Sequence, residues 1–187
     1  SKIYNLKKND IVNITSDITL LLIYFKKNKQ TFDGNKFIDA IIEKVGPNGT
    51  VLFPAFNWDF CNKKKFDYLN SPPQTGSLPN IVFKKKDFKR TRHPIYSFFV
   101  WGKDKNYLCN LRNKSGWGEN SPFSYFYQKN AKNLFIGLDC KDGFTFMHHP
   151  EEKLGTKFRF FKDFSAPYVD EKNDEKIVTY TMHVRDL

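Results

Sequence analysis

The chain has 187 residues, with 31 Lys+Arg against 20 Asp+Glu, so its formal net charge is +11 at pH 7. A hydrophobic fraction of 40%, including 20 Phe and 9 Tyr, excludes a disordered chain, because disordered chains lack the apolar surface needed for a core. The length fits a single domain over residues 1–187. The positive charge favours anionic partners, but abundant Lys, Asn, Ile and Phe are also typical of AT-rich genomes, so we give the charge modest weight.

The cysteines and the apolar runs indicate where the protein works. Cys61, Cys109 and Cys140 are odd in number and widely spaced, which argues against both a disulfide framework and a zinc cage. No apolar run reaches the ~20 residues that a membrane helix needs, and the first residues lack the apolar region of a signal peptide. We therefore expect a cytoplasmic protein without a membrane span.

The first part of the chain predicts a β-α-β unit. Two short apolar strands enclose two helical patterns, with the elements at residues 10–14 (strand), 18–25 (helix), 37–45 (helix) and 50–54 (strand). The polar pair Thr15-Ser16 follows the first strand, and Gly46-Pro47 ends the second helix. Loops that follow parallel strands often bind ligands.

The remainder of the chain predicts a polar, proline-containing surface loop and a further set of short elements. The loop covers residues 57–74, and Ser77 is expected to cap a short helix that runs through Phe83. The other expected elements are strands at 95–100 and 134–138, a helix from the Ser121-Pro122 cap to Tyr127, a helix from about Thr145, and strands at 157–164 and 177–184. This order indicates an α/β fold with a mixed sheet, β-α-β units and flanking helices, parallel early and antiparallel late.

A histidine and a glutamate near residue 150 form a candidate general-base pair. In a helix that starts near Thr145, His148 and Glu151 lie on one face, where the carboxylate can orient the imidazole. Such i,i+3 pairs are common by chance, so the pair alone is weak evidence for catalysis. The adjacent His149 points about a third of a turn away, so the two histidines cannot comfortably share one ion, and we expect no metal.

Five separated segments, taken in order, resemble the aminoglycoside N-acetyltransferase family that modifies the 3-amino group. Each segment is weak evidence by itself, whereas five in the family's order are strong. The segments are residues 49–58 (GTVLFPAFNW), 71–79 (SPPQTGSLP), 90–97 (RTRHPIYS), 118–123 (GENSPF) and 145–151 (TFMHHPE).

The resemblance implies a metal-free N-acetyltransferase that uses acetyl-CoA and has an α/β fold distinct from the histone-type acetyltransferase fold. By similarity, His148 is the general base and Glu151 its orienting partner. The chemistry agrees, because an ammonium group cannot attack a thioester until it loses a proton, and histidine titrates near neutral pH. Direct transfer needs no covalent acyl-enzyme. The family spacing Thr-x-x-His-x-x-Glu selects His148 over His149, although this choice stays open.

The resemblance also implies a coenzyme A region and an acceptor side. Asp59 and Glu119 lie in segments that line the acceptor side in the family, or else are simply exposed to solvent. Alternatives remain for the coenzyme residues too: Gly76 can be an ordinary turn, Arg90 a solvated surface residue, and His93 equally a residue that ties a loop backbone. The residues expected to bind coenzyme A are Thr15, Ser16, Thr75, Gly76, Arg90 and His93.

The sequence departs from the family in charge and in length. Aminoglycosides are polycations, yet this chain carries a charge of +11, so we expect an acceptor with one amine on a neutral or anionic body, such as an amino sugar on a nucleotide or lipid carrier. The family usually continues with helices beyond the position of Leu187, so the chain is expected to lack them. Without these helices an apolar face would be exposed, and a homodimer would cover it.

Two other interpretations remain open. The lysine runs at 63–65 and 84–86, interleaved with aromatic residues, could bind nucleic acid, but no recognised nucleic-acid-binding signature accompanies them. The chain could also have the family's shape without transferase activity.

Overall fold

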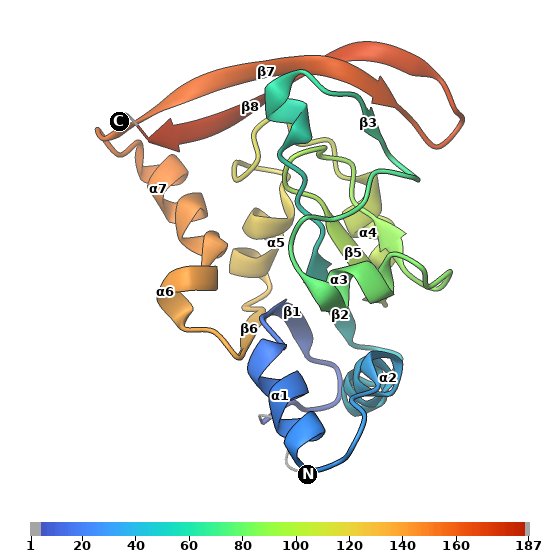
Figure 1. The fold of residues 1–187 in the computed structure, drawn as a ribbon. Coiled ribbons are helices and arrows are strands. Elements are labelled where there is room, and N and C mark those ends of the chain that lie inside the picture. The colour runs from blue at the N-terminus through green and yellow to red at the C-terminus, as the bar shows by residue number, and fades with distance from the viewer. Residues whose placement is uncertain (1–4, 186–187) are drawn as a thin grey trace.

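A computed structural model describes residues 5–185, which form two β-sheets with helices around them (Figure 1). The larger sheet and its connections contain β1 Ile11–Ser16, α1 Thr19–Lys27, α2 Gly34–Val45, β2 Thr50–Pro54, α3 Ser77–Val82, β4 Lys89–Arg90, β5 Phe98–Gly102, α4 Lys105–Asn110, α5 Pro122–Gln128 and β6 Lys132–Ile136. The remaining elements are η1 Asp59–Asn62, β3 Phe66–Asp67, α6 Cys140–Gly143, η2 Thr145–Met147, α7 His148–Leu154, β7 Arg159–Val169 and β8 Glu175–Arg185.

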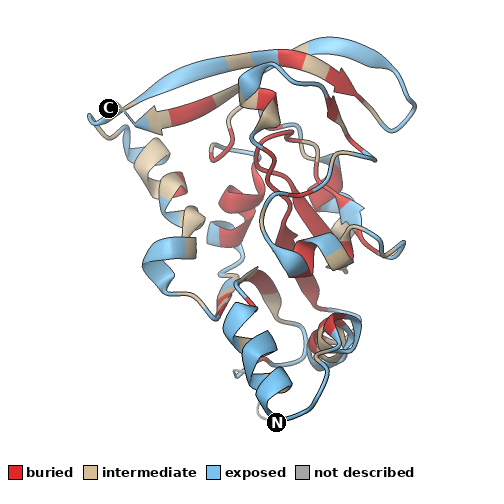
Figure 2. Ribbon diagram, viewed as in Figure 1, coloured by how far each residue is buried: buried red, intermediate tan, exposed pale blue. Residues whose placement is uncertain are grey.

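The larger sheet is mixed and has the strand order β4-β5-β2-β1-β6. Strand β1 pairs in parallel with both β2 and β6, whereas β5 is antiparallel to β2 and β4. Successive side chains of a strand point to opposite faces, so Val51 and Phe53 pack in the apolar cluster that contains Ile38 of α2, while Leu52 packs in a second cluster. Figure 2 shows these central strands buried. The predicted β-α-β unit and mixed α/β fold are confirmed.

The second sheet is a long hairpin, β7–β8, that pairs in parallel with the short strand β3. In Figure 1 the hairpin arches over the end of the molecule opposite α1 and α2. Beneath it, Phe60, Phe66 and Met182 share a buried cluster with Phe98 of β5 and Phe126 of α5. The late antiparallel strands are thus confirmed, and they form a sheet of their own.

Two local expectations are wrong. Residues 57–74 do not form a simple surface loop, because Phe60, Phe66 and Tyr68 are buried and the segment contains η1 and β3. The aromatic side chains of this segment fill the space beneath the hairpin. Helix α3 begins at Ser77, but its N-cap is Gly76, at φ +104°, and the cap forms no side-chain hydrogen bond. By contrast, Ser121 caps α5 as predicted, and its Oγ accepts a hydrogen bond from the Ser124 amide at 3.1 Å.

Helix α1 lies at the position predicted from its apolar run, but no residue within it is buried. Leu20 and Tyr24 are 69% and 60% exposed. Within residues 5–185, no helix has the length and apolar character needed to cross a membrane.

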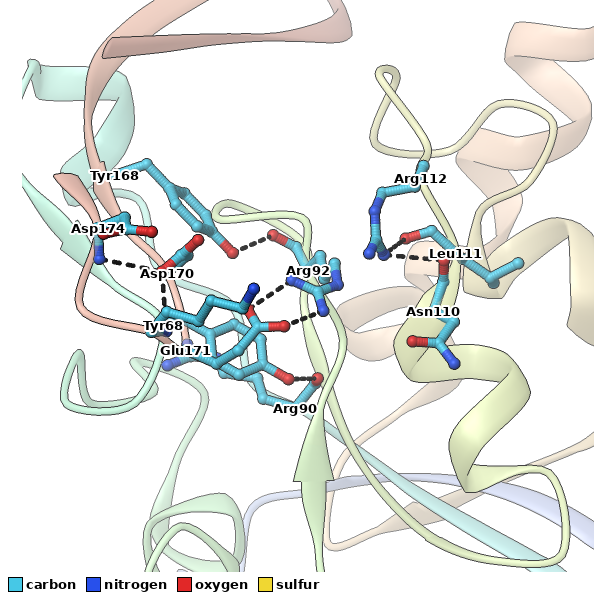
Figure 3. Close-up of polar contacts among 11 residues, drawn as sticks. Tyr68, Arg90, Arg92, Asn110, Leu111, Arg112, Tyr168, Asp170, Glu171 and Asp174 are labelled. Atoms are coloured by element: carbon cyan, nitrogen blue, oxygen red, sulfur yellow. Dashed lines mark hydrogen bonds and ion pairs between the residues drawn. The ribbon is translucent and has the colours of Figure 1, made fainter. Parts of the chain in front are cut away.

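A bidentate ion pair fixes the tip of the hairpin to the larger sheet (Figure 3). Arg92, just after β4, donates from Nη1 to Glu171 Oε2 at 2.6 Å and from Nη2 to Glu171 Oε1. Nearby, the Tyr168 hydroxyl donates to the main-chain oxygen of Arg92 at 3.1 Å, and the Tyr68 hydroxyl donates to that of Arg90. The hydrogen bonds from Arg92 lower the pKa of Glu171 from 4.5 to about 2.

This pair predicts a pH-dependent stability. Because the pKa of Glu171 is lower in the folded chain, its contribution to stability is complete above pH 4.5 and is lost as the pH falls toward about 2. Urea unfolding should therefore show Glu171→Gln less stable than the native chain at pH 7, with the difference shrinking at pH 3. Glu175→Gln is the control, because Glu175 is more exposed and its contact with Lys65 is longer, at 3.4 Å. A Glu171→Gln deficit that is the same at pH 7 and pH 3 would contradict this account.

Candidate active site

The predicted pair His148 and Glu151 forms in α7, where the two side chains lie one turn apart. The imidazole Nδ1 of His148 is 2.8 Å from Glu151 Oε2. Both side chains are partly buried, with exposed fractions of 30% and 23%. An ionised carboxylate only accepts hydrogen bonds, so the tautomer with a proton on Nδ1 satisfies this contact and leaves Nε2 as the basic atom.

Arg159, the first residue of β7, completes the group and was missed by the sequence analysis. Its side chain is 6% exposed, and its Nε lies 2.9 Å from Glu151 Oε2, while its Nη2 lies 3.1 Å from His148 Nδ1. Partial burial acts to raise the pKa of Glu151, but the hydrogen bond with His148 and the charge of Arg159 lower it overall. Glu151 is therefore ionised at neutral pH, the form that accepts a hydrogen bond from Nδ1.

An aromatic wall holds the imidazole of His148. The Trp117 ring lies 4.7 Å from the His148 ring between centroids, Tyr96 lies 4.7 Å from Trp117, and Phe56 lies 4.8 Å from Tyr96. Packing of this kind fixes the ring plane and keeps water from one side of the imidazole. Trp117 was also missed, because no local pattern connects it to a helix that begins 31 residues later.

The adjacent His149 has a different environment. It is 4% exposed, and its Nδ1 lies 2.6 Å from the main-chain oxygen of Trp117. A carbonyl oxygen only accepts hydrogen bonds, so Nδ1 of His149 carries a proton. His149 thus has no carboxylate comparable to Glu151 at Nδ1, which favours His148 as the oriented base.

Four of the six residues expected to bind coenzyme A lie together. Thr15, Ser16 and Thr75 line a cavity of about 220 Å³ at the carboxyl ends of β1 and β2, and Thr145, one turn before His148, also lines it. Gly76 is adjacent, since a Cβ at this position would be 3.4 Å from the Ser16 main-chain oxygen. Strand β1 lies between β2 and β6, so the cavity occupies a switch point of the sheet, where ligands of α/β proteins bind.

The cavity contains a polar atom that needs a partner. Ser16 Oγ is buried and forms no hydrogen bond with the described residues, although Ser16 lines the cavity. Thr75 Oγ1, by contrast, donates to the main-chain oxygen of Pro54. The cavity thus combines apolar side chains with a hydroxyl that can hydrogen-bond to a ligand.

Arg90 and His93 do not line this cavity, and their binding of coenzyme A stays a prediction. Arg90 is 4% exposed, and its guanidinium donates to Ser97 Oγ and to the main-chain oxygens of Ser71 and Ala55, so it is not free to hold a phosphate. His93 is buried, and its Nδ1 accepts from the amides of Ile95 and Tyr96 at 3.3 and 3.1 Å. Burial lowers the pKa of His93 to about 3. His93 thus takes the alternative role of tying a loop backbone.

The two residues expected to line the binding side of the acceptor substrate, Asp59 and Glu119, do not lie together. Asp59 forms an exposed ion pair with Lys64 at 3.2 Å, whereas Glu119 lines a cavity between α5 and α7.

The lysine runs considered for nucleic acid are partly neutralised, because Lys65 pairs with Glu175 and Lys85 with Asp39. Within residues 5–185, no group of three or more His, Cys, Asp or Glu side chains could hold a metal ion.

The sequence and the fold match a known family. The sequence profile described as aminoglycoside 3-N-acetyltransferase matches residues 27–186. The chain belongs to the aminoglycoside 3-N-acetyltransferase family.

Individual relatives give a similar result. YokD of Bacillus subtilis (strain 168), an SPbeta prophage-derived aminoglycoside N(3')-acetyltransferase-like protein, is 29% identical over 140 residues, which are 63% of this chain and 51% of YokD. The match therefore spans about half of that relative. The YokD crystal structure superposes with a TM-score of 0.78 at 23% identity, covering 95% of this chain and 76% of YokD.

Two solved structures with bound ligands share the fold. AAC-IIIb with CoASH has a TM-score of 0.77 at 19% identity, covering 97% of this chain and 71% of that protein. AAC-VIa with sisomicin has a TM-score of 0.79 at 22% identity, covering 95% and 71%.

The burial of Arg90 predicts a structural role. Arg90→Met keeps roughly the side-chain volume but removes the donors to Ser97 Oγ and to the main-chain oxygens of Ser71 and Ala55, the last of which keeps only its bond from Ser97 Oγ, so we expect it to lower the free energy of unfolding by about 2–4 kcal/mol. Arg112→Met is the control, because Arg112 is exposed and bonds only the neighbouring main chain, with an expected effect within about 0.5 kcal/mol. If Arg90→Met left urea unfolding unchanged but abolished stabilisation by acetyl-CoA, the phosphate-binding role would be correct after all.

Proposed function

We propose that this chain transfers an acetyl group from acetyl-CoA to a primary amine of an amino sugar, with His148 as general base. The observation that carries the proposal is the His148–Glu151 pair, one turn beyond Thr145 at the switch-point cavity. The family match and the CoASH bound to AAC-IIIb support coenzyme A as cosubstrate. Sisomicin bound to AAC-VIa supports an amine-bearing sugar as acceptor.

The proposed transfer is direct. Nε2 of His148 takes a proton from the neutral acceptor amine as its nitrogen bonds to the acetyl carbon. The carbon–sulfur bond then breaks, and the imidazolium returns the proton to the sulfur, so that the coenzyme leaves as a thiol. Overall, ammonium and thioester give amide, thiol and one proton. Glu151 stabilises the imidazolium that forms, and Arg159 keeps Glu151 ionised and in place. Thr15, Ser16, Thr75 and Gly76 are the residues proposed to hold the coenzyme.

The first test is to remove the base. His148→Ala should lower the rate of thiol release from acetyl-CoA by roughly 10²–10⁴-fold, the usual contribution of general-base catalysis. The acetyl-CoA-dependent rise in Tm should persist, because the coenzyme cavity is intact. Glu175→Gln, an exposed substitution on the hairpin, serves as the control for both measurements.

Two results would contradict this assignment. If His148→Ala turned over normally and His149→Ala alone were inactive, the base would be His149. If the native chain released no thiol with any amine tested yet was stabilised by acetyl-CoA, the chain would bind the coenzyme without catalysing transfer. Steeply salt-dependent binding of oligonucleotides, with no response to acetyl-CoA, would instead support the nucleic-acid alternative.

The acceptor follows from charge. With a net charge of +11, the chain repels polycations at long range, so the proposed acceptor carries one amine on a neutral or anionic body, such as a nucleotide-linked amino sugar. The runner-up is an aminoglycoside antibiotic, as the family description suggests. The exposed apolar residues of α1 support the expected homodimer as the state in which the chain acts.

Competition between acceptors tests the charge argument. We expect kcat/KM for a uridine-diphosphate amino sugar to exceed that for kanamycin. The ratio of the two values should fall as ionic strength rises, because salt screens both the attraction of the anionic sugar nucleotide and the repulsion of the polycation. Faster acetylation of kanamycin at every salt concentration would favour the antibiotic.

A further inference from the structure

A small basic cavity lies between β8 and the segment that follows α4. Its volume is about 230 Å³, below the range of about 300–1,000 Å³ typical of sites for whole small molecules, so it suits a compact ionic group. It shares no lining residue with the cavity at the carboxyl ends of β1 and β2 or with the one between α5 and α7. Its charged lining residues are Arg92, Arg112 and Lys114, and none of the described side chains that line it is acidic.

The guanidinium of Arg92 is fixed in place and keeps donors for a ligand. Its Nη1 and Nη2 each donate to Glu171, and its side chain is 16% exposed. A guanidinium has two N–H groups on each Nη, so this ion pair leaves one N–H on each. The Tyr68 ring lies 5.7 Å from the guanidinium carbon, and the Tyr168 hydroxyl holds the main-chain oxygen of Arg92. An anion that binds here therefore meets an arginine that is already ordered.

Arg112 supplies a second guanidinium to the same cavity. Its Nη1 donates to the main-chain oxygens of Asn110 and Leu111, at 2.8 and 3.2 Å, which leaves the N–H groups of Nη2 and Nε for a ligand. Figure 3 shows the Arg112 guanidinium on the side of its segment that faces Arg92. Within residues 5–185, Arg112 forms no ion pair.

Lys114 and Tyr180 add two further donors. Lys114 likewise forms no ion pair in the described part of the chain, and its main-chain oxygen accepts from the Thr181 amide of β8 at 2.9 Å. Burial raises the pKa of Tyr180, whereas the charges of Arg112 and Arg92 act to lower it, so both guanidiniums lie near its hydroxyl. The hydroxyl stays protonated at neutral pH and can donate to an anion.

We propose that this cavity binds a phosphate dianion, either free or as the head group of a small phosphomonoester. Glu171 balances the charge of Arg92, so the charges of Arg112 and Lys114 remain and a dianion offsets them. Donors that come from three segments of the chain match the several oxygens of a tetrahedral phosphate better than the two oxygens of a planar carboxylate. The proposal is independent of the proposed function, because no residue of the cavity belongs to the transferase site.

Calorimetric titration at constant ionic strength tests this site with three probes: inorganic phosphate, glucose 6-phosphate and glucose. Both phosphates should bind saturably and raise the Tm, whereas glucose should do neither. Constant ionic strength matters because salt alone screens the charges of the cavity. The tighter binder of the two phosphates identifies whether the group is taken free or as an ester.

A matched pair of variants locates the binding. Arg112→Met should weaken phosphate binding by roughly tenfold or more, because it removes a charge-assisted contact, and its urea unfolding should stay native-like. Lys86→Met is the control, because Lys86 is exposed, does not line the cavity, and loses the same charge on substitution. Phosphate binding to Lys86→Met should equal that of the native chain.

Three results would overturn the proposal. The first is no saturable binding of either phosphate, and the second is equal weakening by Arg112→Met and Lys86→Met, which would show general attraction to a chain of charge +11 and an adventitious ion only. The third is undiminished binding to Arg112→Met; weaker binding to Ser16→Ala would then place the anion in the cavity proposed for the coenzyme. Phosphate binding without thiol release from acetyl-CoA would leave this site standing and count against the transferase proposal alone.

Discussion

A buried guanidinium holds the frame on which the rest of the structure depends. Within residues 5–185 Arg90 has no carboxylate partner, and its three hydrogen bonds reach residues from three different segments: Ala55 after β2, Ser71 before α3, and Ser97 before β5. Burying a cation costs several kcal/mol unless its donors are satisfied. Burial lowers the pKa of Arg90 to about 10, so it remains charged at neutral pH. The rings of Phe66 and Phe99 lie 4.7 and 5.3 Å from its guanidinium carbon, which adds cation–π attraction.

This frame positions both halves of the candidate site. The segment bound by Arg90 continues to Thr75, in the wall of the cavity proposed for the coenzyme, while the hairpin packed on the same core begins with Arg159. Arg159 links β7 to α7 through Glu151 and His148. The orientation of the base therefore depends on tertiary packing as well as on the i,i+3 spacing within α7. The two histidines of α7 differ because one faces a carboxylate and the other a carbonyl oxygen.

The sequence predicted what depends on local pattern and missed what depends on distant packing. Periodicity was sufficient for the β-α-β unit, for the Ser121 cap and for the late hairpin, because each is specified by neighbouring residues. Only the family resemblance predicted that Thr15, Ser16, Thr75 and Gly76 lie in one region. The burial of Arg90 was not predicted, because an arginine in a basic stretch is usually solvated, and only the fold shows three acceptors around it. Arg159 and Trp117 could not be found, since nothing near them in the chain indicates that they converge on His148.

The central claim is that Glu151 orients His148 so that Nε2 is the base. The most direct measurement is the ¹⁵N chemical shifts of the His148 ring nitrogens in the native chain at a pH where the ring is neutral. The account predicts the tautomer with a proton on Nδ1, hydrogen-bonded to Glu151, and a lone pair on Nε2. A ring protonated on Nε2, with Nδ1 accepting a hydrogen bond from Arg159, would contradict it, because no base would then face an acceptor amine.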